Sequence, residues 1–200
     1  GVGGIVGSMI AYWLSELGQK NIVGLEKSSV IPSDIASTAH ASDFVYNTTH
    51  DKLGCWTTAY SRKFYEDNGF FLKKGGLEIC RKGDDARWEE LKRKVGSGKA
   101  FGTNVRLISA AEAKEKLPLL DEESLMGAMW DPDAGLVIPR SQDVVSFAVE
   151  SAKDKGALKT FTDTPAIDFQ VENGRVIGVK TEKGFIKTDK VVICSGIWGP

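Results

Sequence analysis

Hydrophobic residues near the start of the chain recur at helical spacing behind a cluster of glycines. This spacing predicts an amphipathic helix with one apolar face, and Gly18 is placed to end it. The apolar positions are Met9, Ile10, Trp13, Leu14 and Leu17. The run NIVGLEK at residues 21–27 follows and predicts a short buried strand of the parallel-sheet kind. Turn, helix, strand and acid together predict the second half of a βαβ unit, whose first strand would precede Gly1.

The rest of the chain alternates helical and strand-like patterns after a loop at residues 31–50. The expected helices span residues 52–67, 84–98, 109–117 and 139–155. The expected strand segments are 70–83, 125–138, 165–171, 175–182 and 184–196. Asn173-Gly174 is a two-residue hairpin signal. Trp56, Tyr60 and Phe64 repeat every fourth residue, which favours packing of these rings in a core.

Composition and charge exclude several classes of protein. Hydrophobic residues make up 42% and charged residues 26%, with a net charge of -1, as in an ordinary globular chain. We therefore expect no nucleic-acid partner, and no apolar run is long enough for a membrane span. Three widely spaced cysteines favour a reducing compartment without disulfides or metal, so we expect a cytoplasmic location, or the mitochondrial matrix in a eukaryote. Both chain ends look internal, which predicts a fragment of a longer protein.

The glycine cluster carries the first chemical signal. A dinucleotide-binding turn needs glycines where the chain bends and where the backbone approaches the pyrophosphate. Counted back from Gly7, the usual spacing requires glycine at positions 2 and 4, but position 2 is Val2. Glu26 ends the following strand, where a carboxylate accepts hydrogen bonds from an adenosine ribose. An acid there favours FAD or NAD over NADP.

The loop at residues 36–44, ASTAHASDF, helps to distinguish a flavoprotein from a nicotinamide-dependent enzyme. In nicotinamide enzymes the chain usually enters another helix directly after the acid. Here Ser37 and Thr38 can bind phosphate or ribityl oxygens, and small residues leave room for a flat ring. His40 is one of two histidines in the chain, and neutral imidazole is a nucleophile. This loop favours a flavoprotein, while a nicotinamide-dependent dehydrogenase stays an alternative.

With these motifs in order, the sequence resembles the amino-acid-oxidase superfamily of FAD-dependent oxidoreductases. Within it, the likeness is to the dimethylglycine and sarcosine dehydrogenase (oxidase) branch. The stretches that carry it include GGIVGSMIAYWLSELG, VGLEK, STAHAS, GGLEI and VVICSGIWG, and they run nearly end to end. The resemblance implies that His40 bonds covalently to the flavin. Val2, Ala36 and Asp43 depart from the family pattern, because each stands where glycine is common.

The resemblance also implies the other cofactor-binding residues. Glycines and apolar residues of the first turn would lie at the pyrophosphate, Glu26 and Lys27 at the ribose, and the loop beside the flavin. The full set is Gly3, Gly4, Ile5, Val6, Gly7, Glu26, Lys27, Ser37, Thr38, Ala39, His40, Phe44, Ala166, Ser195 and Gly196. Catalytic residues are expected beyond Pro200.

The implied fold is α/β with α+β elements. A discontinuous Rossmann-like FAD-binding domain, with a parallel sheet and a β-hairpin layer, would span residues 1–73 and 141–200. Residues 74–140 would form part of a mixed substrate domain.

The implied activity is the FAD-dependent demethylation of an N-methylated glycine-type amine such as dimethylglycine or sarcosine. Oxygen or an electron-transfer flavoprotein would accept the electrons, and tetrahydrofolate could act in an absent downstream domain. Oxidation of another amino acid or amine is the alternative. We expect the 200-residue fragment alone to be inactive.

Overall fold

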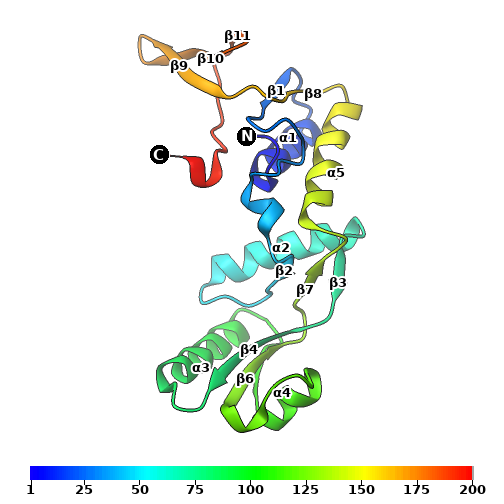
Figure 1. The fold of residues 1–200 in the computed structure, drawn as a ribbon, viewed down its shortest axis with the longest axis vertical. Helices are drawn as coiled ribbons and strands as arrows, with labels where there is room; N and C mark the ends of the chain where they lie inside the picture. Colours follow the sequence, from blue (N-terminus) through cyan, green and yellow to red (C-terminus); the bar gives the residue numbers. More distant parts are fainter. Residues whose placement is uncertain (200) are drawn as a thin grey trace. The chain divides into compact units, whose positions relative to one another are not determined.

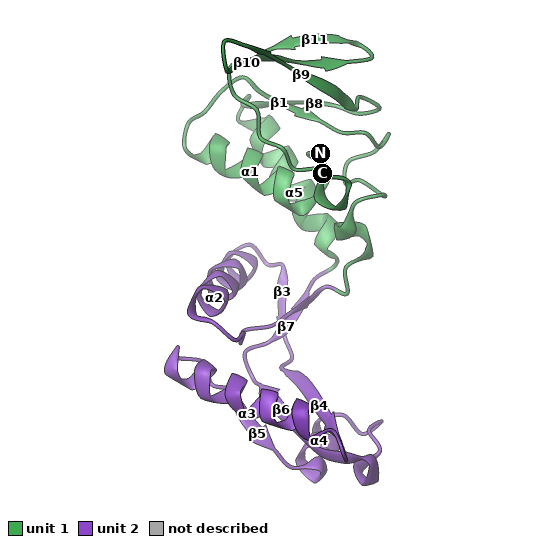
Figure 2. Ribbon diagram, turned by 90° about the vertical axis from the view of Figure 1, so that its left-hand side faces the viewer, with its two compact units in different colours: residues 1–42, 139–200 green, residues 43–138 purple. Residues whose placement is uncertain are grey.

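The computed structural model describes residues 1–199, which divide into two compact units (Figure 2). The first unit comprises residues 1–42 and 139–200, and the second comprises residues 43–138. The sequence placed the first division after residue 73. Residues 43–73 group with the second unit because β2 (Phe44–Val45) and β3 (Phe71–Lys73) both pair with β7 (Gly135–Val137). The assignment of one unit to the cofactor and the other to the substrate stays a prediction.

The first unit contains two long helices, a parallel strand pair and an antiparallel sheet (Figure 1). Its elements are α1 (Ile5–Glu16), β1 (Ile22–Leu25), η1 (Ser37–His40), α5 (Ser141–Asp154), β8 (Leu158–Phe161), β9 (Ala166–Glu172), β10 (Arg175–Thr181), β11 (Gly184–Lys187) and η3 (Gly196–Trp198). Strands β1 and β8 are parallel, with Ile22 opposite Leu158, whereas β9, β10 and β11 form an antiparallel meander. The hairpin residues Asn173 and Gly174 have φ values of 50° and 74°, as a type I′ turn requires. The predicted α/β class is confirmed.

The core of the first unit lies between α1, α5 and the parallel strands. Ala11 of α1 meets Val145 and Val149 of α5, and Leu158 of β8 joins them. Helix α1 buries Ser8, Ala11 and Ser15. Small residues on that face let α1 approach α5 closely. The apolar face predicted from the sequence is therefore not the buried one, and Leu17 on that face is 78% exposed.

The second unit contains three helices and two antiparallel sheets. Its remaining elements are α2 (Lys52–Asp67), β4 (Gly76–Arg81), α3 (Asp85–Ala100), β5 (Arg106–Ile108), α4 (Ala110–Lys116), η2 (Glu122–Ser124) and β6 (Leu125–Asp131). One sheet has the order β2-β7-β3 and the other the order β4-β6-β5. Across residues 1–199, no helix combines the length and the apolarity that crossing a membrane requires.

Helices α3 and α4 pack on the β4-β6-β5 sheet through two separate clusters. Leu91 and Val95 of α3 meet Met129 of β6, whereas Ala113 of α4 meets Ala128. Met129 and Ala128 are neighbours on one strand, so their side chains point to opposite faces of the sheet. Helix α4 begins with a capping box, in which the Ser109 and Glu112 side chains each accept the backbone N–H of the other residue.

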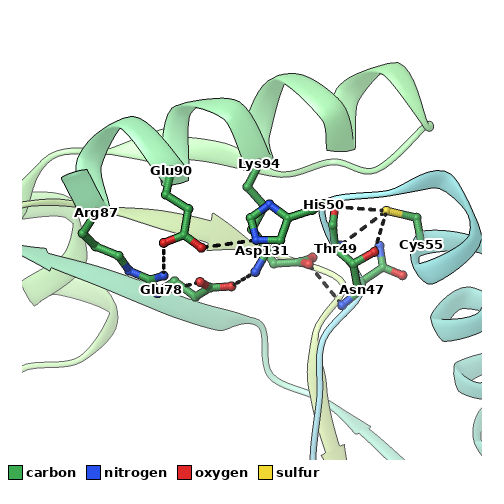
Figure 3. A network of polar contacts seen from close by, with 9 residues as sticks. All are labelled: Asn47, Thr49, His50, Cys55, Glu78, Arg87, Glu90, Lys94 and Asp131. Atoms are coloured by element: carbon green, nitrogen blue, oxygen red, sulfur yellow. Dashed lines mark hydrogen bonds and ion pairs between the residues drawn. The ribbon is translucent and has the colours of Figure 1, made fainter. Parts of the chain in front are cut away.

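A network of ion pairs joins α3 to β4 and to the loop before α2 (Figure 3). Arg87 of α3 binds Glu78 at 2.8 Å and Glu90 at 2.7 Å. Lys94 also binds Glu78, whose side chain is only 10% exposed. The Nε2 atom of His50 lies 3.2 Å from Oε1 of Glu90. His50 is therefore an exposed loop residue that ties its loop to α3.

The structure corrects three expectations about single segments. Trp56 and Tyr60 stack on each other with ring centres 5.5 Å apart, but both are more than half exposed, so core packing was the wrong interpretation. The last predicted strand ends at Lys187, and Ile193 is 62% exposed because residues 188–195 have no strand partner within the described chain. Strand β8 was missed because its sequence, LKTF, has a lysine and a threonine between its two apolar residues and lacks the apolar run of β1.

Candidate cofactor site

The glycine turn before α1 is packed tightly against its own unit. A β-carbon at Gly3 would lie 2.7 Å from Cβ of Ser33 and 2.8 Å from Oε2 of Glu26. A β-carbon at Gly7 would lie 2.2 Å from the carbonyl oxygen of Gly1. Both distances are shorter than any ordinary carbon contact, so the packing of the chain itself requires glycine at these two positions.

Val2, which departs from the glycine pattern, is accommodated by a glycine opposite it. Its side chain is 5% exposed, and its N–H donates to the Leu25 carbonyl at 3.0 Å. A β-carbon at Gly24 of β1 would lie 3.0 Å from three carbons of Val2. The valine therefore occupies space that a side chain at position 24 would otherwise fill, and the turn keeps its form.

Glu26 anchors the turn to the end of β1. Its buried carboxylate accepts the N–H of Gly3 at 2.9 Å and the N–H of Ser28 at 3.0 Å. The backbone N–H of Glu26 donates to Phe161 of β8, and its carbonyl accepts the N–H of Thr164. Each carboxylate oxygen has a further lone pair that a ribose hydroxyl could use.

The first turn of α1 leaves both space and backbone donors. A β-carbon at Gly4 would meet nothing closer than Cβ of Ala36 at 3.5 Å, so the packing of the chain does not itself require glycine there. Within residues 1–199, the amides of Val6 and Gly7 have no hydrogen-bond acceptor, and the first turn contains no acid. Free amides and the positive end of a helix dipole suit a phosphate group. The turn therefore fits a pyrophosphate.

The loop with the candidate flavin residues is held against this helix end. Oγ1 of Thr38 accepts the N–H of Ile5 at 3.0 Å, which ties η1 to the start of α1. Ser37 and Ala39 lie on the same short turn, and His40 ends it with an exposed side chain. Asp43 has a φ of 62°, which lies in the left-handed region that favours glycine. The residue therefore adopts a conformation that suits the glycine common at this position.

Two further segments of the first unit reach the end of β1. The nitrogen of Gly1 donates to the carbonyl of Cys194, and Nζ of Lys27 lies 5.1 Å above the ring of Trp198. Ser195 and Gly196, which open η3, lie between these two contacts in the sequence. Ala166 begins β9 two residues after Thr164, whose N–H donates to the Glu26 carbonyl at 2.9 Å.

Fourteen of the fifteen predicted residues thus belong to one unit, and the contacts above join their five segments. The exception is Phe44, which lies on β2 of the second unit. The glycine turn, the buried carboxylate and the free amides all fit a dinucleotide. The roles of the individual residues stay predictions.

Sequence reasoning missed three residues of this region. Ser28 donates its backbone N–H to Glu26, and Ser33 donates its own to the Gly3 carbonyl at 2.9 Å. The hydroxyl of Ser33 is buried and has no partner among the described residues. The polar composition of residues 28–34 was the available signal for both serines. No local signal could have found Trp198, because its contact with Lys27 spans nearly the whole sequence.

Comparison with known proteins agrees with this geometry. Human mitochondrial sarcosine dehydrogenase is 28% identical over 98% of the chain, and the mouse mitochondrial pyruvate dehydrogenase phosphatase regulatory subunit is 29% identical over the same share. The chain spans only 22% of the length of either relative. The crystal structure of L-proline dehydrogenase from P. horikoshii matches with a TM-score of 0.86 and 31% identity, over 98% of this chain and 51% of that one.

The solved structure of glycine oxidase from Bacillus cereus also matches, with a TM-score of 0.80 and 26% identity over 98% of this chain and 54% of that one. The family model of the DAO, or FAD-dependent, oxidoreductases matches residues 3–200. The match covers the glycine turn, β1, the loop that carries His40 and the closing segment around Ser195. The chain therefore belongs to the DAO family of FAD-dependent oxidoreductases, whose members include amine and amino-acid oxidising enzymes.

Proposed function

We propose that the protein oxidises an N-methylated glycine-type amine, such as dimethylglycine or sarcosine, with FAD as the acceptor. The observation that carries the proposal is the loop of η1, which is tied by Thr38 to the first turn of α1 and presents His40. Human sarcosine and dimethylglycine dehydrogenases, at 28% and 25% identity, support the choice of amine.

Different residues would bind the pyrophosphate, the ribose and the flavin of FAD. The amides of the first turn of α1 would bind the pyrophosphate, and Glu26 would accept the ribose hydroxyls. Thr38 holds η1 beside them, so the loop would continue toward the flavin. When bound, the flavin supplies the hydride acceptor at its N5 atom. The amine must give up its hydride as a neutral species, and the product iminium ion would react with water or, in a downstream domain, with tetrahydrofolate.

His40 would bond covalently to the flavin. Its side chain is exposed at the end of η1, and no described hydrogen bond engages the imidazole. A neutral imidazole nitrogen therefore has its lone pair available to bond with the 8α-methyl carbon of the flavin. The imidazole N–H and one methyl C–H would be broken, the two electrons would reduce the flavin ring, and the electron acceptor of the enzyme would reoxidise it. The bond would hold the cofactor and, by withdrawing electrons, would make the flavin a stronger oxidant.

A direct experiment is anaerobic addition of amines to the full-length protein while its flavin absorption is followed. We expect sarcosine or dimethylglycine to bleach the flavin band, with saturable rates. Glycine and L-proline are the comparison substrates, because solved structures of a glycine oxidase and an L-proline dehydrogenase resemble the chain. Bleaching by either of these alone would move the function to another amine, and a protein without flavin would revive the nicotinamide alternative.

A non-enzymatic role is the second candidate, because one relative is a regulatory subunit of a phosphatase at 29% identity. The identities to this subunit and to sarcosine dehydrogenase differ by only one percentage point. Absence of any amine-dependent bleaching, in a protein that retains flavin, would favour this role.

The electron acceptor and the location are part of the same proposal. Oxygen consumption during turnover would indicate an oxidase, and reduction of an electron-transfer flavoprotein would indicate a dehydrogenase. Mitochondrial relatives support a matrix location in a eukaryotic cell. Fractionation of the source cells would test it.

A further inference from the structure

The second unit contains an open cleft of about 300 Å³ between β2 with the residues that follow it and one face of α2. Phe44, Tyr46 and Thr49 line one wall, and Thr58, Ser61 and Tyr65 line the other. The three residues of α2 are spaced by three and four positions, so they share one face of the helix. The volume is at the lower end of the range for small-molecule sites.

The helix wall of the cleft presents hydroxyl groups that the chain does not use. Within residues 1–199, the hydroxyls of Thr58, Ser61 and Tyr65 take part in no hydrogen bond with another residue. Each can donate one hydrogen bond and accept others. Partial burial raises the pKa of Tyr65, so this hydroxyl keeps its proton and remains a donor. A ligand with several hydroxyl groups would satisfy this wall.

None of the residues that line the cleft carries a charge at neutral pH. Nζ of Lys94 lies 5.3 Å above the ring of Tyr46, but it is already paired with Glu78. A carboxylate or an ammonium in the cleft would therefore lose hydration without gaining a counter-ion. The lining favours a neutral ligand.

The wall opposite α2 is fixed in place before any ligand binds. The N–H of Asn47 donates to Oδ2 of the buried Asp131 at 3.2 Å, and the N–H of Thr49 donates to Sγ of Cys55 at 3.3 Å (Figure 3). Lys94 covers the ring of Tyr46 from the side of α3. A wall held by these contacts needs little ordering when a ligand binds, which favours affinity.

We propose that this cleft binds a neutral, polyhydroxylated group of roughly the size of a small polyol or a monosaccharide. The aromatic rings of Phe44 and Tyr46 would cover the carbon skeleton, and the hydroxyls of α2 would bind its oxygens. Apart from Phe44, none of the residues that line the cleft is among those expected to bind the cofactor. The site therefore goes beyond the proposed function, which concerns the cofactor and the amine that is oxidised.

Binding can be measured by NMR on the full-length protein with xylitol as the neutral probe and xylonate, which carries a carboxylate in place of one alcohol group, as the charged comparison. The ring signals of Tyr46 and Tyr65 report on the site, and Tyr46→Phe and Tyr65→Phe variants assign them. We expect xylitol to shift both signals in a saturable manner. Xylonate should leave both unchanged.

Matched variants separate the site from the rest of α2. Tyr65→Phe and Thr58→Val should each weaken xylitol binding about fivefold, the effect of one lost hydrogen bond. Tyr60→Phe removes a hydroxyl on the same helix outside the cleft and should change nothing. Backbone NMR spectra check that each variant is folded, and Ser61→Ala replaces any that is not.

The proposal is overturned if xylitol gives no saturable shift, if xylonate binds equally well, or if Tyr60→Phe weakens binding as much as Tyr65→Phe. Since the measurement needs neither flavin nor turnover, its failure leaves the proposed oxidation standing. Conversely, failure of the oxidation assay leaves the cleft proposal standing.

Discussion

Replacement of Glu26 by glutamine should both destabilise the first unit and weaken its hold on FAD. The carboxylate is 5% exposed and accepts two backbone amides, from Gly3 at 2.9 Å and Ser28 at 3.0 Å. A hydrogen bond to a charged acceptor contributes about 1.5–3 kcal/mol, compared with about 1 kcal/mol for a neutral one. Glutamine keeps one acceptor oxygen but directs its NH2 group at the other amide. One bond is therefore weakened and the other lost, which should cost about 3 kcal/mol.

Urea denaturation followed by tryptophan fluorescence measures this loss as a difference in the free energy of unfolding. Glu172→Gln is the matched control, because Glu172 is an exposed acid of the same unit, and its replacement should cost less than about 0.5 kcal/mol. Titration of the His40→Ala apoprotein with FAD, with and without Glu26→Gln, gives the second readout, because this background forms no covalent bond to the flavin. Loss of a charged acceptor for the ribose should raise the Kd about thirtyfold, which corresponds to about 2 kcal/mol.

Two results would refute the reasoning about Glu26. A stability loss below about 1 kcal/mol, or one no larger than that of the control, would mean that the two amides do not depend on the carboxylate. An unchanged Kd for FAD in a folded Glu26→Gln variant would mean that the ribose is not bound there.

Three further predictions follow from particular contacts. Gly7→Ala should cost about 2 kcal/mol of stability because its β-carbon would lie 2.2 Å from a backbone oxygen. Gly4→Ala should leave the denaturation curve nearly unchanged and should weaken FAD binding in the same titration. A larger loss of stability in Gly4→Ala than in Gly7→Ala would contradict the packing argument. Burial raises the pKa of Asp133, but hydrogen bonds from Lys73 and Asn104 outweigh this effect and hold the pKa below its usual value. This group should therefore stabilise the fold above its unfolded pKa of about 3.9, with the gain lost as the pH falls through the lower folded pKa. Urea denaturation at a series of decreasing pH values should show a smaller loss of unfolding free energy for Asp133→Asn than for the wild type. The same loss in both proteins would contradict this prediction. Glu78→Ala leaves Lys94 and Arg87 without their buried partner and should cost about 3 kcal/mol, whereas Glu89→Ala in an exposed pair should cost less than about 0.5 kcal/mol in the same assay.

The parts of the fold that follow from local patterns could be read from the sequence. Helices α2 and α5, the capping box of α4 and the Asn173-Gly174 hairpin all depend on residues close together in the chain. The order of glycine turn, helix, strand and acid led to Glu26 in the same way. Its contact with the N–H of Gly3 was not predicted, because it joins residues 23 positions apart.

Features that depend on distant partners could not be read in this way. Periodicity identified an apolar face on α1, but the helix buries Ser8, Ala11 and Ser15 because small residues allow the close approach to α5. Residues 188–195 are apolar enough for a strand, yet a strand also needs a neighbour to bond with. The contact between Lys27 and Trp198 joins opposite ends of the sequence, and no local signal marks it.

The central claim is that the loop of η1 carries the flavin through His40. The most direct measurement is mass spectrometry of the peptide that contains residues 36–44, after acid denaturation of the full-length protein. The account predicts this peptide with the mass of covalently bound flavin, and the loss of that mass in a folded His40→Ala variant. A flavin released entirely by acid, or found on a peptide without His40, would contradict it.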